Sequence, residues 1–328
     1  MSSRAENRDE VLKQDIKKLA NAENLTQKLR PIGTWGKGVH RFDAKQINAL
    51  IAALASKRPL LVRGEPGVGK SQLAHAAAEL LQRGFVPYVV QPDSEYSDLL
   101  WSVDYTRRLS DAQLAANDAE AATKVKQLEN YIGPGPLWWA FNWADAETHN
   151  SKCSHNYCPP QDPEGPNPKE EGIVLLIDEI DKADISLANG LLEVLGNKAF
   201  AIPPLDKTLC PEGKAPLVVL TSNDIRELPA ALLRRCVVLE LTLPDKLAEH
   251  FIAIGEQHFP TMDKEVLQLV VEQILQDRNN CREFPKTGLA EFIDLLGALS
   301  QVANTKEGQI SWLNKLGLYF HKSHALPR

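Results

Sequence analysis

The residue types best suited to chemistry lie in one short segment that fits the phosphate-loop pattern G-x-x-x-x-G-K-[ST] without a mismatch. The segment consists of Gly64, Glu65, Pro66, Gly67, Val68, Gly69, Lys70 and Ser71. Its glycines let backbone N–H groups curve around a phosphate. We expect Lys70 to reach the β- and γ-phosphates of a nucleotide and the Ser71 hydroxyl to bind Mg²⁺. A glycine turn that binds nothing is the alternative, but such loops are built to bind phosphate.

The elements that must position this loop can be read on either side of it. Residues 60–63 form a short apolar run typical of a buried strand, and residues 72–82 carry alanine, leucine and glutamate at helical spacing. Strand, glycine loop and helix in this order are the context that a phosphate loop requires. The segment is therefore predicted to bind the phosphates of a nucleotide.

Two adjacent carboxylates, Asp178 and Glu179, follow the most apolar run of the chain, residues 172–177. That run predicts a central parallel strand covered on both faces, and its C-terminal end faces the ligand crevice of such a sheet. Asp178 is placed to hold Mg²⁺, and Glu179 to polarise the water that attacks the γ-phosphate. Taken alone, two acids after a strand could simply cap a helix.

Polar residues also follow the next predicted strand, residues 217–220. Asn223 is expected beside the phosphate loop, where its amide could orient the attacking water; an ordinary turn asparagine is the alternative. Arg234 and Arg235 precede a further strand at residues 237–241. A guanidinium there could reach the γ-phosphate bound by a neighbouring subunit, while a surface salt bridge is the simpler interpretation.

Composition narrows the classes of function. The 328 residues are 43% hydrophobic and carry a formal net charge of −6, which gives no general attraction to nucleic acid or anionic lipid. The mildly basic segment 1–45 is interpreted as solvated helix surface. No apolar run approaches a membrane span and the first ten residues are polar, so we expect a cytoplasmic protein without a membrane partner. Five cysteines do not suggest a disulfide framework.

The chain is predicted to contain an N-terminal helical arm (1–44), an α/β nucleotide-binding domain (45–243) with an insertion at about 104–171, and a helical lid (244–328). One helix is expected around residues 111–130, and residues 145–171 are interpreted as an added surface loop. Four aromatic residues of the insertion could pack in its core or grip a partner: Trp138, Trp139, Phe141 and Trp143. Four others have metal-ligand spacing, although a loop without metal is favoured: His149, Cys153, His155 and Cys158.

Four motifs in order resemble those of AAA+ ATPases: the phosphate loop, LLIDEIDKAD at 175–184, TSN at 221–223 and ALLRRC at 231–236. More narrowly, together with residues 98–108 and 133–137, they resemble the MoxR-like branch. The resemblance implies an AAA+ P-loop NTPase fold, an α/β domain with a parallel central sheet followed by a small α-helical lid. It also implies Mg²⁺-dependent ATP hydrolysis. Members typically form homo-oligomeric hexameric rings that remodel or activate a protein client, often one with a von Willebrand A domain.

The same resemblance assigns roles to individual positions. Residues 64–71 match the Walker A loop, Asp178 and Glu179 match Walker B, and Asn223 matches sensor 1. Arg235 matches the arginine finger that acts on a neighbouring subunit, with Arg234 as its alternate. Lys286 is the candidate for the basic sensor 2 residue of the lid, with Arg282 behind it. Two insertions typical of the branch are expected near residues 133–137 and 199–209.

Two other functions stay open at this point. The first is a nucleotide-gated scaffold with slow turnover, of the kind found in bacterial defence complexes. The second is a GTP-cleaving or nucleic-acid motor subunit, which the acidic balance and the lack of a basic stripe disfavour. No motif in the sequence distinguishes ATP from GTP.

Overall fold

The computed structural model describes residues 2–115, 118–152, 158–159, 164–244, 246–280 and 286–320, and the chain divides into two compact units. Unit 1 comprises Met1–Arg63 and Ser71–Leu239, and unit 2 comprises Gly64–Lys70 and Glu240–Arg328. No helix in the described ranges has the length and apolar character that a membrane crossing requires.

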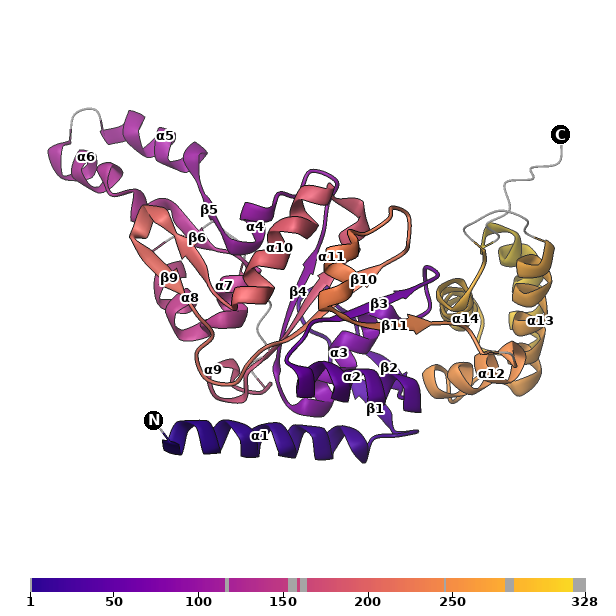
Figure 1. The fold of residues 1–328 in the computed structure, drawn as a ribbon. Helices are drawn as coiled ribbons and strands as arrows, with labels where there is room; N and C mark the ends of the chain where they lie inside the picture. Colours follow the sequence, from indigo (N-terminus) through magenta and orange to yellow (C-terminus); the bar gives the residue numbers. More distant parts are fainter. Residues whose placement is uncertain are drawn as a thin grey trace. The chain divides into compact units, whose positions relative to one another are not determined.

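A five-stranded parallel sheet forms the centre of the α/β fold (Figure 1). Its order is β11-β3-β10-β7-β4, so β10 (Leu217–Ser222) lies between β3 (Leu60–Gly64) and β7 (Ile173–Asp178). The outer strands are β4 (Gly84–Val89) and β11 (Val237–Leu241). Every residue of β7 and β10 is buried, as expected for strands covered on both faces. The predicted sheet is confirmed, and its order brings the ends of β3, β10 and β7 together.

Helices of unit 1 cover the sheet and fix the ends of its strands. The first group is α1 (Ser2–Ala20), α2 (Ala44–Ser56) and α3 (Lys70–Leu81). The second is α4 (Tyr96–Leu100), α10 (Ile185–Asn197) and α11 (Ala230–Arg235). Asp43 caps α2 by accepting from the Gln46 N–H at 2.8 Å. A two-stranded hairpin, β1 (Thr26–Leu29) and β2 (Gly38–Arg41), lies before α2 and was not predicted, because both strands are short and mostly polar.

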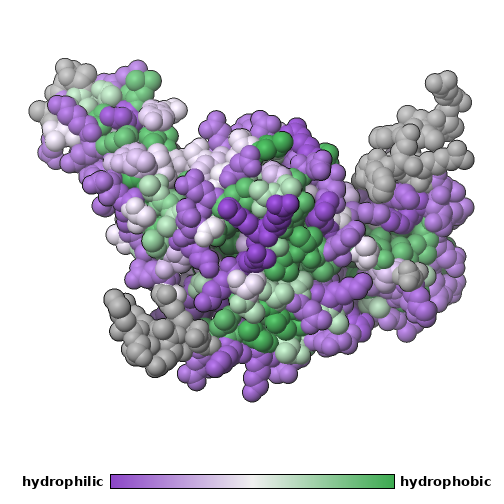
Figure 2. Space-filling view, viewed as in Figure 1, coloured by the Kyte–Doolittle hydropathy of each residue, from purple (hydrophilic) through white to green (hydrophobic). Residues whose placement is uncertain are grey.

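The insertion is built differently from the prediction. Strands β5 (Trp101–Val103) and β6 (Ile132–Pro134) pair, and between them lie two helices, α5 (Tyr105–Leu114) and α6 (Ala119–Lys126), followed by the 3₁₀ helix η2 (Leu128–Tyr131). The single helix expected around 111–130 is therefore wrong. Apolar surface is visible on the α5–α6 hairpin (Figure 2). Two leucines of α5, Leu109 and Leu114, are 63% and 81% exposed.

The aromatic residues of the insertion belong to the main core. Trp138, Trp139 and Phe141 lie on α7 (Pro136–Phe141), and Trp143 begins α8 (Trp143–Asn150). All four are at most 7% exposed and pack with residues of β4 and β7. The Trp138 indole N–H donates to Asp145 at 2.7 Å, which satisfies its polar atom in the core. The interpretation as core residues is confirmed, and the alternative that they grip a partner is wrong.

Residues 145–171 are not entirely a loop, because α8 continues to Asn150 and a short helix, α9 (Pro168–Glu171), precedes β7. The segment 199–209 forms a hairpin of β8 (Phe200–Ile202), the 3₁₀ helix η4 (Pro203–Leu205) and β9 (Lys207–Leu209). Phe200 and Ile202 of β8 and Leu209 of β9 belong to the main core.

The described residues of unit 2 are mainly helical, apart from the phosphate loop, the end of β11 and short connections. It contains α12 (Leu247–His258), α13 (Lys264–Asn280), α14 (Leu289–Val302), α15 (Lys306–Leu316) and the 3₁₀ helix η5 (Gly317–Phe320). Phe251 of α12 stacks on Phe292 of α14 with ring centroids 5.2 Å apart, and both are fully buried. This separate apolar core explains why the segment folds as a compact body of its own.

Candidate nucleotide-binding and hydrolysis site

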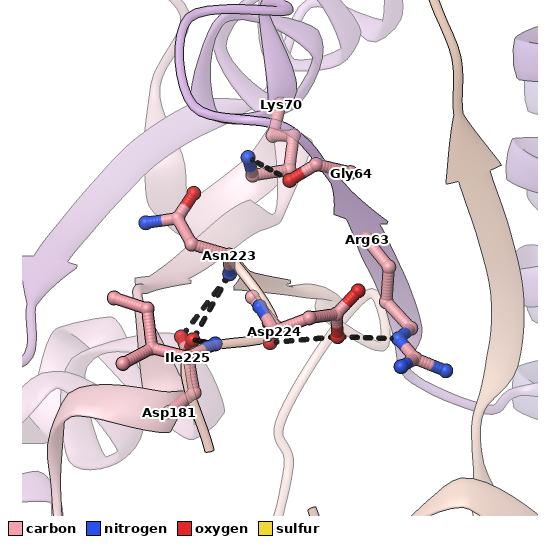
Figure 3. Close-up of polar contacts among 8 residues, drawn as sticks. Arg63, Gly64, Lys70, Asp181, Asn223, Asp224 and Ile225 are labelled. Atoms are coloured by element: carbon pink, nitrogen blue, oxygen red, sulfur yellow. Dashed lines mark hydrogen bonds and ion pairs between the residues drawn. The ribbon is translucent and has the colours of Figure 1, made fainter. Parts of the chain in front are cut away.

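The loop between β3 and α3 has the backbone that its sequence requires. Gly64, Gly67 and Gly69 all have positive φ, at 147°, 79° and 91°. A Cβ on Gly64 would lie 2.3 Å from the carbonyl oxygen of Leu241, so a side chain cannot replace the glycine there. The Lys70 ammonium donates to the carbonyl oxygen of Gly64 at 2.8 Å (Figure 3). It also donates to the carbonyl oxygen of Glu65 at 2.8 Å. The loop therefore curves around the lysine that is expected to meet phosphate.

The next residue along the chain, Ser71, joins the carboxylate at the end of β7. The Ser71 hydroxyl donates to Asp178 Oδ1 at 2.6 Å, and the Thr221 hydroxyl donates to the same oxygen at 2.5 Å. A hydroxyl and a carboxylate oxygen in direct contact form the all-oxygen donor set that Mg²⁺ prefers. Both predicted metal ligands thus fit the ion, and Thr221 orients the carboxylate.

Glu179 leaves the strand with a backbone that non-glycine residues seldom adopt, at φ 58° and ψ 48°. The Thr221 hydroxyl accepts a hydrogen bond from the Glu179 N–H at 2.8 Å, which helps to hold that conformation. The Asn223 amide donates to Glu179 Oε1 at 2.8 Å, and Lys182 forms an ion pair with Oε2. Both carboxylate oxygens are therefore engaged by polar groups from the chain. The hydrogen bond to Glu179 is also the main reason that the pKa of Lys182 lies above its ordinary value.

Asp181 is a site residue that the sequence did not reveal. Its side chain lies under the loop that follows β10, and the residue is 1% exposed. It accepts from the backbone N–H groups of Asn223, at 3.1 and 3.3 Å, and of Ile225, at 2.9 Å (Figure 3). The only sequence signal was its place in the run LLIDEIDKAD, three residues after Asp178. Asp181 thus anchors the backbone of the residue whose amide holds Glu179.

A second ion pair flanks the same loop. Arg63 Nε donates to Asp224 Oδ1 at 2.7 Å, which connects the end of β3 with the loop that follows β10 (Figure 3). Asp224 has a left-handed backbone with φ 56°, so the chain turns sharply directly after Asn223. Asn223 is therefore held by the backbone contacts of Asp181 on one side and by this turn on the other.

The two candidate finger arginines differ in their surroundings. Arg235, at the end of α11, donates to the carbonyl oxygen of Leu192 on α10 at 2.6 Å, while its side chain stays exposed. Arg234 is exposed, and its side chain makes no hydrogen bond or ion pair with any residue that the structure describes. Both lie on the surface of unit 1.

The structure describes only some of the residues predicted for sensor 2 of the lid and for a zinc site. Lys286 lies just before α14 and is partly buried, whereas Arg282 lies outside the described residues. Of the four possible zinc ligands, Cys153 and His155 lie outside the described residues, and His149 stacks on Trp138 with ring centroids 5.1 Å apart. Among the residues that are described, no cluster of three or more potential ligands is present.

Several solved structures show a distant likeness to the chain. A proposed ATPase from Cytophaga hutchinsonii is 15% identical over 96% of this chain and 83% of its own length, with a TM-score of 0.42. The RuvB Holliday junction branch migration motor of Thermotoga maritima is 15% identical over 83% and 67%, with a TM-score of 0.45. A HORMA:CdnC:Trip13 complex from Escherichia coli MS115-1 contains a chain 14% identical over 80% and 77%, with a TM-score of 0.40.

No curated protein sequence matches the chain. The model of the AAA domain, dynein-related subfamily, matches residues 59–236, which is more than half of the chain and contains the phosphate loop, both carboxylates, Asn223 and the two arginines. The residues that the structure brings together thus fall inside the matched region. The chain belongs to the AAA domain family, in its dynein-related subfamily.

Proposed function

We propose that the protein binds ATP with Mg²⁺ and hydrolyses it as a homo-oligomeric, hexameric ring of the MoxR-like type, which remodels or activates a protein client. The observation that carries the proposal is the cluster at the ends of β7 and β10. Ser71 and Asp178 share a hydrogen bond where Mg²⁺ would bind, and Glu179 next to them is held by Asn223. These are the groups that phosphoryl transfer to water requires.

Each residue of the cluster has a distinct chemical task in this proposal. Ser71 and Asp178 would hold the metal, which supplies charge neutralisation at the phosphates. Glu179 would accept hydrogen bonds from the attacking water and polarise it, and Asn223 would fix the direction of the Glu179 carboxylate. Lys70 would exchange its contacts with the carbonyl groups of the loop for contacts with phosphate oxygens.

The proposal of a ring rests on the positions of Arg234 and Arg235 and on the resemblance to MoxR-like proteins. Arg234 and Arg235 lie on the surface of unit 1, where a guanidinium can reach the nucleotide of an adjacent copy. A protein client, with a von Willebrand A domain as the first class to try, follows from the resemblance to MoxR-like proteins. Hydrolysis would then depend on assembly, because one site would need residues of two subunits.

Glu179→Gln tests the hydrolysis. The amide keeps the shape and the hydrogen bond to Asn223 but cannot act as a base, so we expect ATP to stay bound and turnover to fall at least about a hundredfold. Phosphate release and bound nucleotide would be measured in parallel, with Lys70→Ala as the variant that fails to bind. Hydrolysis by Glu179→Gln at the wild-type rate would remove the assigned role.

A slow-turnover scaffold is the second candidate, and one observation favours it. Both oxygens of Glu179 are occupied, one by Asn223 and one by Lys182. Each oxygen can still accept from water, but the two contacts restrict the directions from which water can approach the carboxylate. Steady-state hydrolysis by the assembled protein, with and without a client, distinguishes a turning motor from a scaffold that ATP only assembles.

A further inference from the structure

A cavity of about 770 Å³ lies in unit 1, at the edge of the central sheet where the strands begin. Its wall includes Pro59, Arg83 and Leu217, which stand at the starts of β3, β4 and β10. Leu217 and Ser222 begin and end β10, so at about 3.3 Å per residue the two edges of the sheet are roughly 16 Å apart. The cavity is therefore remote from the carboxylates that follow β7, and its volume lies in the range of sites for small ligands.

Buried polar contacts hold the elements around this cavity in place. Arg83 Nη2 donates to Asp15 Oδ2 of α1 at 2.7 Å, and Arg83 Nη1 donates to the carbonyl oxygen of Ala215 at 2.9 Å. Arg83 is 5% and Asp15 3% exposed. Separation of a buried ion pair leaves each charge uncompensated, so these contacts fix α1 and the segment before β10 against the start of β4. The cavity is thus formed before any ligand binds.

Most residues of the cavity wall are apolar. Leu54 of α2, Phe141 of α7 and Val218 of β10 line it from the core, and each is at most 6% exposed. Leu12 of α1 and Leu195 of α10 line it as half-buried residues. Concave sites with apolar walls gain binding energy by taking apolar surface out of water. The wall therefore suits the apolar body of a ligand.

The charged residues of the same wall favour an anion. Five are basic and two are acidic: Lys57, Arg58, Arg83, Lys198 and Lys214 against Glu170 and Glu212. Arg83 and Lys214 have carboxylate partners outside the wall, Asp15 and Glu171, at 2.7 Å each. The hydrogen bond from Lys214 is the main reason that the pKa of the Glu171 carboxyl lies below its usual value, and the charges of Lys18 and Arg83 lower it further. Cations at this edge of the sheet thus stabilise negative charge.

The other three cations have no such partner. The side chains of Lys57, Arg58 and Lys198 make no hydrogen bond or ion pair with any residue that the structure describes. Lys57 and Lys198 directly follow α2 and α10, where a cation also stabilises the negative end of a helix. Because the carbonyl groups of those helix ends oppose an anion, only the side chains can attract one. Helix stabilisation alone is the structural alternative, and it predicts no effect on a ligand.

We propose that this cavity binds a small amphipathic anion, with an apolar body against the core residues of the wall and a charged head beside Lys57, Arg58 and Lys198. The head is a carboxylate, a phosphate or a sulfonate, because each offers several acceptor oxygens to ammonium and guanidinium groups. A neutral molecule of the same shape would gain the apolar contacts without the attraction of the cations. This site is additional to nucleotide hydrolysis and does not depend on it.

Two fluorescent probes with the same rings separate the contribution of the charge from that of the apolar body. Anilinonaphthalenesulfonate is an amphipathic anion, and phenylnaphthylamine has the same rings without the sulfonate. Fluorescence titration gives the dissociation constants of the full chain for both probes, and we expect the anion to bind at least about tenfold more tightly. Titrations with and without excess ATP and Mg²⁺ should agree, because the probe does not occupy the nucleotide site. Competition by decanoate and by decyl phosphate distinguishes a carboxylate head from a phosphate head.

Substitutions in the wall locate the bound probe. Lys57→Glu combined with Lys198→Glu should weaken the sulfonate probe at least about tenfold and leave the neutral probe within about twofold. Leu12→Trp narrows the cavity from a half-buried position, so both probes should weaken at least about threefold. Lys45→Glu is the matched control, because it makes the same change at the exposed start of α2, the helix whose other end precedes Lys57. Thermal unfolding checks that each variant is folded.

Selective loss of the anionic probe in the double lysine variant, with an unchanged control, supports the assignment. If that variant binds the sulfonate as the control does, the lysines only stabilise helix ends and the proposal is overturned. Equal affinities of the wild type for the two probes overturn it as well, because the charge would then contribute nothing. Unchanged binding of both probes in Leu12→Trp, or displacement of the sulfonate by ATP, would place the probe at another site and have the same consequence.

Discussion

Removal of the Asp181 carboxylate tests whether the site depends on a buried anchor that contacts neither nucleotide nor metal ligand. Asp181→Ala leaves the backbone N–H groups of Asn223 and Ile225 without their acceptor. Each unpaired buried N–H group costs about 1–3 kcal/mol. Because Ile225 is 66% exposed and water can reach that end of the loop, we expect a total loss of about 3 kcal/mol in the free energy of unfolding. Domains of ordinary stability tolerate such a loss.

The same substitution should reduce hydrolysis more than it reduces nucleotide affinity. Asn223 would keep its amide but lose the backbone contacts that aim it at Glu179, so kcat should fall about tenfold while KM changes less than about threefold. Asp181→Asn keeps one acceptor oxygen in the same shape and is expected to lie between the alanine variant and the wild type. Urea unfolding and steady-state phosphate release measure the two effects.

A neighbouring aspartate gives the control. Asp184 has a side chain that is 89% exposed and lies 3.9 Å from Arg226, so Asp184→Ala should change stability by less than about 1 kcal/mol. If Asp181→Ala unfolds within about 0.5 kcal/mol of the wild type and retains full kcat, the anchoring role is wrong.

Two further predictions concern the arginines and a buried histidine. Arg235→Ala or Arg234→Ala is expected to lower hydrolysis at least about tenfold while the Kd for ATP stays within about twofold; full activity in both variants would exclude an arginine that acts across subunits. Burial, helped by the charge of Arg30, lowers the pKa of His75 to about 4. In the unfolded chain the imidazole is protonated below pH ~6.5, whereas in the folded chain it is protonated only below pH ~4. The stability of the folded state is therefore unaffected by this group above pH ~6.5 and decreases as the pH falls from ~6.5 to ~4. His75→Phe, which preserves the stacking on Phe85, should lose less stability than the wild type between pH 7 and 5 in urea unfolding; a parallel loss would contradict this origin.

The sequence was sufficient to predict the strands that are followed by polar residues. Residues 172–177 are apolar without interruption because β7 is covered on both faces, and the acids that follow them mark the edge where a ligand binds. The phosphate loop could also be predicted from its glycines, because three of them adopt a positive φ that other residues avoid. Periodicity and backbone requirements are local properties, so a single sequence displays them.

Contacts between distant segments left no such signal. Arg278 and Glu65 are ordinary charged residues in a helix and a loop, and only the fold brings them to 2.5 Å. Hairpin β1–β2 is short and mostly polar, so it carried no alternating apolar pattern. The start of α6 is marked by Asp118, whose side chain accepts from the Glu120 N–H at 2.9 Å, a capping signal that the surrounding alanine-rich run obscured.

Thr221 shows why the site must be understood as a network. Its hydroxyl donates to Asp178 and accepts from the Glu179 N–H, so one buried oxygen fixes both the proposed metal ligand and the backbone of the proposed base. A hydroxyl can do both at once because it is donor and acceptor, which valine of the same shape cannot be. The strand order that places β10 between β3 and β7 puts this threonine beside both carboxylates. The position of the proposed base is therefore set by a residue of the neighbouring strand as much as by the strand that carries it.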